Sequence, residues 1–117
     1  MLVIATGAGK LPIENIRNNT TTSAAGAACS VTLAAVNPGR HIIHSIQWSY
    51  TAAPTGGKLT VAVNSVTVKE VDITAAGPGG YNLLVLGGNN QAVVITLAAP
   101  GGAVVGKLNV DSSISNE

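Results

Sequence analysis

Hydrophobic and polar positions alternate in steps of two from about residue 30 onward. The clearest segment spans 41–50, where the alternate positions on one side are Ile42, His44, Ile46, Trp48 and Tyr50. A period of two is typical of a β-strand, because successive side chains point to opposite faces of the sheet. We therefore expect a strand over 41–50 whose Ile42-to-Tyr50 side faces the core.

The same alternation recurs in shorter segments separated by glycine and proline. The expected strands are 31–35, 58–63, 66–73, 81–86, 91–97 and 103–110. Asn64-Ser65 suits a tight turn, and a change of phase between Val68 and Val71 predicts a β-bulge near Lys69-Glu70. Glycine and proline interrupt nearly every longer window, which disfavours helices. Short strands at roughly ten-residue spacing predict an all-β fold, a single β-sandwich or jelly-roll domain.

Three glycine-rich turns resemble one another in sequence. They cover 51–57, 74–80 and 97–102, and each follows an expected strand. Two strands and a return turn fit between consecutive turns, so we expect the three loops to lie at the same end of the sandwich. A duplicated solenoid unit is the alternative, although the strands between the turns differ considerably.

The chain divides into three parts by composition. Residues 1–29 include Leu2–Ala5, a possible strand, and a run at 18–28 that is almost entirely Asn, Thr, Ser, Ala and Gly. Such a run has too little apolar surface to form a core, so we predict an N-terminal arm or long loop, ordered by a neighbour. We predict that residues 30–110 form the β-sandwich and residues 111–117 a short polar tail.

Charge is scarce along this chain. Only 9% of the 117 residues are charged and the net charge is +1, whereas 46% are hydrophobic. Typical soluble domains have about 25% charged residues, so identical copies or a partner are expected to cover part of the surface; a Thr-, Ser- and Asn-rich surface is the alternative. The charge balance predicts no nucleic-acid partner. No apolar run approaches the roughly 20 residues that span a membrane, and the N-terminus is a poor signal peptide.

Motifs that suggest chemistry fail on spacing or context. Gly7–Lys10 lacks the preceding glycine and the following Ser or Thr of a phosphate-binding loop. His41 and His44 are three residues apart on a strand, so they point to opposite faces and are not expected to share a metal. Glu70 and Asp72 lie on one side of a strand beside a lysine, which is typical of a solvated edge. The sequence therefore predicts no catalytic, metal-binding or cofactor-binding residue, and no enzyme.

Three other residues have structural interpretations. Cys29 is the single cysteine, so no internal disulfide is possible, and its small apolar neighbours predict a buried thiol. Trp48 and Tyr50 form a possible sugar-stacking platform, but they lie on the expected core face of the strand. We expect them to pack in the core.

Four segments together resemble a family of small phage proteins that are structural components of the virion. These segments are 46–60, 71–79, 92–102 and 105–110, and the resemblance extends over about 29–110. It implies a jelly-roll decoration (cement) protein on the capsid surface, often a homotrimer, with the major capsid protein as its partner. Such a protein is made in the host cytoplasm and has no catalytic residues. The matching motifs are mostly turns, and residues 1–28 match no fixed pattern.

Two functional hypotheses follow. The first is a capsid decoration protein that binds the shell and stabilises it. The alternative is a tail-fibre or receptor-binding β-sandwich module whose glycine-rich loops contact host glycan or protein. The sequence assigns no interface residue to either hypothesis.

Overall fold

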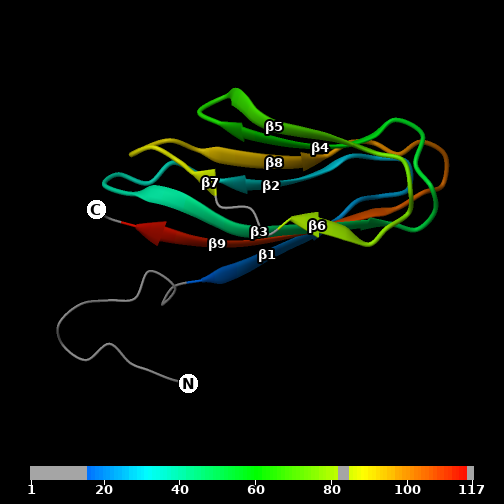
Figure 1. Ribbon diagram of the computed structural model, residues 1–117, viewed down its shortest axis with the longest axis horizontal. Coiled ribbons are helices and arrows are strands. Elements are labelled where there is room, and N and C mark those ends of the chain that lie inside the picture. The colour runs from blue at the N-terminus through cyan, green and yellow to red at the C-terminus, as the bar shows by residue number, and fades with distance from the viewer. Residues whose placement is uncertain (1–15, 82–84, 116–117) are drawn as a thin grey trace, which may run out of the picture.

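The computed structural model of the protein describes residues 16–81 and 85–115. In these residues, two antiparallel β-sheets pack face to face, as Figure 1 shows. The strands are β1 (Arg17–Thr22), β2 (Cys29–Leu33), β3 (Arg40–Tyr50), β4 (Gly57–Val63), β5 (Val66–Ile73), β6 (Gly79–Tyr81), β7 (Val85–Leu86), β8 (Val93–Leu97) and β9 (Gly106–Ser115). The described part contains no helix long and apolar enough to cross a membrane.

The strand order is that of a jelly roll. One sheet has the order β1-β9-β3-β6, with β7 also paired to β3, and the other has the order β2-β8-β4-β5. The pairs are nested along the chain: β4 pairs with β5, β3 with β6 and β7, β2 with β8, and β1 with β9. The innermost turn of this nest is Asn64-Ser65. The predicted fold class, an all-β sandwich of the jelly-roll type, is therefore confirmed.

The core consists of the side chains that the two sheets turn toward each other. In β8, Val93, Ile95 and Leu97 are fully buried and the intervening residues are partly exposed. The other fully buried hydrophobic residues in the core are Ile43, Ile46, Leu59, Val61, Leu108 and Val110. Small and branched side chains thus fill most of the space between the sheets, as the composition requires.

The expected facing of β3 is wrong in its first half. A register irregularity between Ile43 and Ser45 shifts the alternation along the strand. His41 and Ile43 are buried, whereas Ile42 and His44 are only partly buried. One extra residue in a strand moves every side chain before it to the opposite face. Apolar residues on both sides of this segment hide the shift in the sequence.

The predicted turn and bulge between β4 and β5 are both present. Asn64 and Ser65 have φ values of 51° and 66°, as the two central residues of a type I′ hairpin turn require. The register then shifts between the pairs Ala62–Thr67 and Val61–Lys69. Val68 is the extra residue, directly before the predicted position.

The sandwich extends beyond the predicted 30–110 at both ends. Within the segment expected to be an arm, β1 pairs with β9 from Arg17 to Thr22. The segment expected to be a polar tail continues β9 to Ser115. Ladder hydrogen bonds form with any side chains, and polar pairs such as Asn18–Asp111 (2.9 Å) join these strands. A strand can therefore form here without a hydrophobic face; the possible strand Leu2–Ala5 lies outside the described residues.

Candidate functional site

The three glycine-rich loops lie together at one end of the sandwich, on the right in Figure 1. The Thr55 amide donates a hydrogen bond to the Pro100 carbonyl (2.9 Å), and the Tyr50 amide donates one to the Ala76 carbonyl (2.8 Å). Their predicted clustering is confirmed. The loops consist of Thr, Ala, Pro and Gly over 51–56, 74–78 and 98–102. This end therefore presents neither charge nor an aromatic ring from the loops.

The two histidines noted in the sequence have separate environments, whereas Glu70 and Asp72 are both exposed on the same face of the edge strand β5, as predicted. The Nε2 atom of His41 lies 2.6 Å from the Ala34 carbonyl oxygen, and that of His44 lies 2.8 Å from the Ser113 hydroxyl. Glu70 forms an ion pair with Lys58 at 3.7 Å. Across the described residues, no group of three or more His, Cys, Asp or Glu side chains is placed to hold a metal ion.

Cys29, Trp48 and Tyr50 are core residues, as the sequence predicted. Their exposed fractions are 7%, 9% and 5%. Burial raises the pKa of the Cys29 thiol, which lowers its reactivity. Trp48 packs against Tyr81, with ring centroids 5.5 Å apart and planes tilted by 48°. The indole is therefore part of the packing between the sheets.

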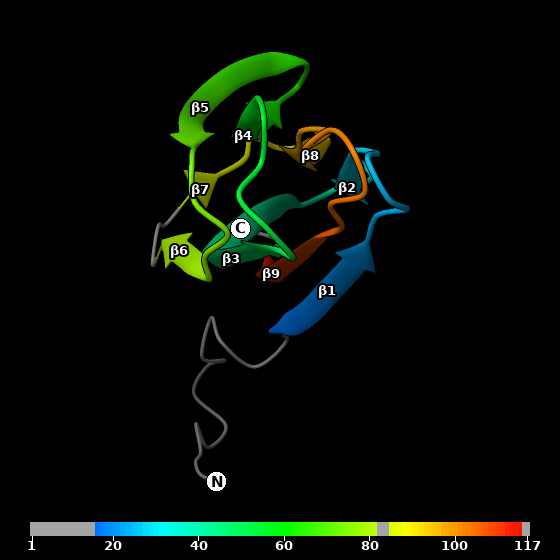
Figure 2. The same ribbon diagram turned by 90° about the vertical axis from the view of Figure 1, so that its right-hand side faces the viewer.

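The sandwich has two open sides where the edges of its sheets face each other. Figure 2 shows them end on: β5 stands beside β6 and β7 on one side, and β1 beside β2 on the other. Side chains on these open sides are in contact with solvent, so they are the places where a partner or ligand has access. The two sides differ in chemistry.

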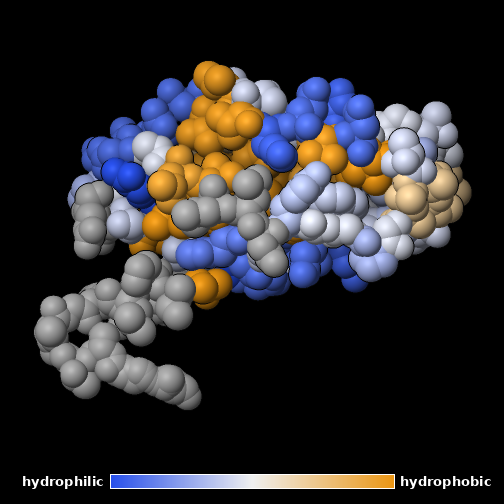
Figure 3. All heavy atoms as spheres, viewed as in Figure 1, coloured by the Kyte–Doolittle hydropathy of each residue, from blue (hydrophilic) through white to orange (hydrophobic). Residues whose placement is uncertain are grey.

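The apolar side is the open side between β5 and β7, defined by Val66, Val68 and Leu86. These three side chains are 63%, 53% and 55% exposed. Figure 3 views the molecule from this side and shows hydrophobic surface over β5 and β7. The Lys69 ammonium lies over the Tyr81 ring, 5.2 Å from its centroid. Exposed apolar residues that gather in one place are typical of an interaction surface.

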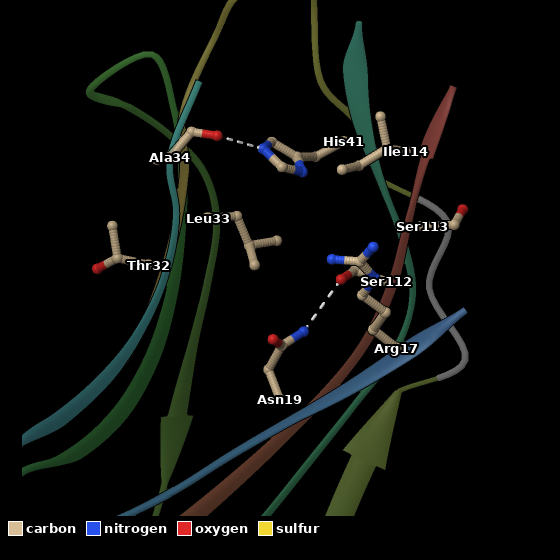
Figure 4. A pocket seen from close by; sticks show the side chains of 9 residues that line it. All are labelled: Arg17, Asn19, Thr32, Leu33, Ala34, His41, Ser112, Ser113 and Ile114. Atoms are coloured by element: carbon tan, nitrogen blue, oxygen red, sulfur yellow. Dashed lines mark hydrogen bonds between the residues drawn. The ribbon is translucent and has the colours of Figure 1, made fainter. Parts of the chain in front are cut away.

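The polar cleft is a cavity on the opposite side, where β1 and the ends of β3 and β9 approach β2. Its volume is about 340 Å³. It is lined by Arg17, Asn19, Thr32, Leu33, Ala34, His41, Ser112, Ser113 and Ile114. Figure 4 shows the side chains of Arg17, Asn19 and Leu33 directed into the same space. At this end of the sandwich, inward-facing positions such as Arg17, Asn19 and Ser112 are therefore polar, whereas the inward-facing positions of the core are hydrophobic.

Hydrogen bonds fix part of the cleft wall. The Asn19 amide nitrogen donates to the Ser112 hydroxyl oxygen (3.1 Å) and to the Val110 carbonyl (3.3 Å). The His41 ring donates from Nε2 to the Ala34 carbonyl, because a carbonyl oxygen only accepts. His41 and Ser112 are each 5% exposed. The polar groups of this wall are therefore held in place before any ligand arrives.

Three of the cleft residues could not be found from the sequence. Arg17 and Asn19 lie in the predicted arm, and Ser112 lies in the predicted tail. The stretches 17–22 and 111–113 are polar at every position, so the hydrophobic alternation that marks a strand is missing from them. The sequence offered one signal: residues 17, 19 and 21 are all polar. These residues form a polar row on the inward face of β1, but this can be recognised only after the strand itself is known.

A second hollow of about 550 Å³ lies on the outer face of the first sheet, beside Tyr81. Its lining combines polar, aromatic and glycine residues: Gln47, Trp48, Ser49, Pro78, Gly79, Gly80, Tyr81 and Asn109. Along the same face, the Ser45 hydroxyl donates to an Asp111 carboxylate oxygen (2.9 Å). The outer face is thus a hydrogen-bonded polar surface whose groups largely bind one another.

Comparisons with known proteins concern the fold alone. No protein-family model and no curated protein matches the chain. A solved structure of dimeric latent PorU from Porphyromonas gingivalis has a TM-score of 0.43 and 9% identity, covering 93% of this chain and 14% of that chain. A family 35 carbohydrate binding module from Clostridium thermocellum has a TM-score of 0.38 and 16% identity, covering 94% and 84%. The chain thus spans a small fraction of the first structure's length, and neither function transfers to it.

Proposed function

We propose that this protein is a non-enzymatic structural component of a phage particle, a decoration protein that binds the outside of the capsid shell. The proposal rests on the resemblance of residues 29–110 to small virion proteins and on the scarcity of charge. The observation that carries it is the apolar side, where Val66, Val68 and Leu86 are all more than half exposed. The partner is the major capsid protein, and the protein reaches the virion after synthesis in the host cytoplasm.

Docking through the apolar side is favourable for a simple reason. Burying one valine stabilises a contact by roughly 1.5 to 3 kcal/mol. Val66 is 63% exposed and Val68 is 53% exposed. Covering both side chains with a partner would therefore contribute roughly 2 to 3 kcal/mol to the free energy of binding. A contact of this strength is weak alone, but repetition over a symmetric shell or within an oligomer multiplies it through effective concentration.

A pair of neighbouring substitutions tests the docking surface. V66E introduces a charge on the apolar side, whereas T67E introduces the same charge on the other face of β5, where Thr67 pairs with Ala62. Both positions are exposed, so both variants are expected to fold. Co-sedimentation with purified capsid shells should retain T67E and lose V66E. Equal binding of the two variants would place the contact elsewhere.

The proposed oligomer is a homotrimer. Light scattering during size-exclusion chromatography measures the mass of the particle in solution. The proposal expects three times the 11.6 kDa mass of one chain. A stable monomer that still binds shells would retain the decoration function and remove the trimer from the proposal.

The loop end supports a second candidate, a receptor-binding module of the tail. The observation behind it is that the three loops meet at one end, where the Thr55–Pro100 hydrogen bond joins two of them and the Tyr50–Ala76 hydrogen bond holds the third. Replacing Thr55 by Lys at this end should abolish binding of the purified protein to host cells if the loops contact a receptor. Binding to shells with no binding to host cells would exclude this role.

A further inference from the structure

The polar cleft has positive charge and no described carboxylate on its wall. Arg17 is exposed and contributes its guanidinium group to the lining. Among residues 16–81 and 85–115, the ion pair within 4 Å joins Lys58 and Glu70, so Arg17 has no described carboxylate within that distance. A guanidinium without an anionic partner at the mouth of a cavity favours a negatively charged ligand.

A second donor faces the cleft from the buried wall. The Ser112 hydroxyl oxygen accepts the hydrogen bond from Asn19. Within the described residues no acceptor is paired with the hydroxyl hydrogen of Ser112, so this group can donate to a ligand. The Nε2 proton of His41 is already engaged with Ala34. The available donors are therefore Arg17 and Ser112, supported by Asn19.

Part of the cleft wall is apolar, beside the polar residues Thr32, His41 and Ser113. Leu33 and Ala34 line it from β2 and the residue that follows, and Ile114 lines it from β9. In Figure 4, Leu33 points across the cleft toward Arg17. A volume of about 340 Å³ lies at the lower end of the range of small-molecule sites. Such a space is larger than an inorganic anion requires, and it offers an apolar surface for the body of an organic one.

We propose that the polar cleft binds a small organic anion, with its carboxylate or phosphate group on Arg17 and Ser112 and its apolar body against Leu33 and Ile114. Two charge-assisted hydrogen bonds hold the anionic group. Burial of the body adds the hydrophobic contribution. The site lies on the opposite side of the sandwich from the apolar side, so it operates independently of docking onto a shell.

The test uses amide chemical shifts of the labelled full-length protein during titration with butyrate, acetate, butanol and inorganic phosphate. Butyrate has both the charged group and the apolar body, acetate and phosphate have the charge alone, and butanol has the body alone. We expect saturable shifts at cleft residues with butyrate tighter than the other three probes. Acetate and phosphate as bare charges then distinguish which anionic group the donors prefer.

Matched variants assign the binding to the cleft. R17Q removes the charge and should weaken butyrate binding about tenfold or more, because hydrogen bonds to charged groups are the strong ones. R17K should retain part of the affinity. K107Q removes a charge from an exposed lysine on the outward side of β9 and should leave the affinity unchanged. S112A should weaken binding severalfold.

Three results would overturn the proposal. The first is the absence of saturable shifts at the cleft amides with every probe. The second is equal weakening by R17Q and K107Q, which would mean a general charge effect. The third is butanol binding as tightly as butyrate, which would remove the anionic group from the recognition. Arg17 is exposed, so loss of folding does not complicate the R17Q result, and Trp48 fluorescence checks the fold.

Discussion

Gly79 is the position where one added methyl group tests the packing of the core. It pairs with Trp48 across β3 and β6. A Cβ atom at this position would lie 2.7 Å from two carbons of the Trp48 ring and 2.9 Å from its nitrogen. The ring is only 9% exposed and is packed against Tyr81, so it has little room to withdraw. The substitution G79A therefore forces Trp48 out of its place.

The expected cost follows from measured overpacking in other cores. Extra methyl groups in a well-packed interior destabilise by about 1–3 kcal/mol. For a domain of this size, the melting temperature should fall by roughly 4–15 °C. Trp48 is the single tryptophan of the chain, so its fluorescence reports the displacement directly. We expect the emission of folded G79A to shift to longer wavelength as the ring gains contact with water.

A matched glycine separates packing from backbone strain. At Gly102 an added Cβ atom meets nothing within 4 Å, although the φ of +57° is unfavourable for other residues. G102A should cost about 1–2 kcal/mol for the left-handed backbone alone and leave the tryptophan emission unchanged. Wild-type stability and an unchanged spectrum in G79A would refute the described packing of Trp48 between the sheets.

Three further predictions concern stability and reactivity. Burial raises the pKa of the Tyr50 hydroxyl above the ordinary 10.0. The folded state therefore favours the neutral hydroxyl, and this contribution to stability is complete below pH 10.0, the pKa in the unfolded chain. It is lost as the pH rises through the raised pKa of the folded state. Y50F should therefore show a flatter loss of stability in urea titrations at alkaline pH, and at neutral pH it should lose about 1 kcal/mol with the hydrogen bond to Ala98. Burial also raises the pKa of Cys29, so iodoacetamide should alkylate the thiol only when the sandwich opens, and fast alkylation of the native protein would contradict its burial. S65G relieves about 1–2 kcal/mol of left-handed strain at the φ of 66°, and the greater freedom of glycine in the unfolded chain costs about 0.5–1 kcal/mol. The unfolding free energy should therefore rise by roughly 0.5–1 kcal/mol; a lower melting temperature would contradict the type I′ turn.

The sequence was sufficient for the fold class because alternation and turn chemistry act locally. Asn64-Ser65 and the bulge after it follow from residue types and phase within ten positions. The clustering of the three loops followed from equal spacing of similar turns. These features depend on the preferences of short segments, so a single sequence contains them.

The site residues depend on long-range pairing and could not be predicted. Arg17 and Ser112 meet because β1 pairs with β9, almost the whole chain apart. Residues 17–22 of β1 and the last residues of β9, from Asp111 onward, lack hydrophobic alternation, so composition indicated an arm and a tail. The shift in β3 was missed for a related reason: Ile42 and Ile43 are both hydrophobic, and only pairing with β9 determines which one faces inward.

The sequence shows the apolar residues of β5, but it does not show that they are exposed to solvent. Val66 and Val68 fit a buried face as well as an open one. Their exposure results from the position of β5 at the edge of its sheet. An edge position is a property of the topology and not of the strand itself. The docking proposal therefore needed the structure, whereas the resemblance to virion proteins did not.

Calorimetry of purified capsid shells, with and without the added protein, tests the proposed function most directly. A decoration protein that binds across neighbouring capsid subunits must raise the temperature at which the shell comes apart, because it binds the assembled state and not the separated subunits. We predict a higher transition for shells with the wild-type protein and with T67E, and no change with V66E. The same transition temperature for bare shells and for shells saturated with the wild-type protein would contradict the decoration function.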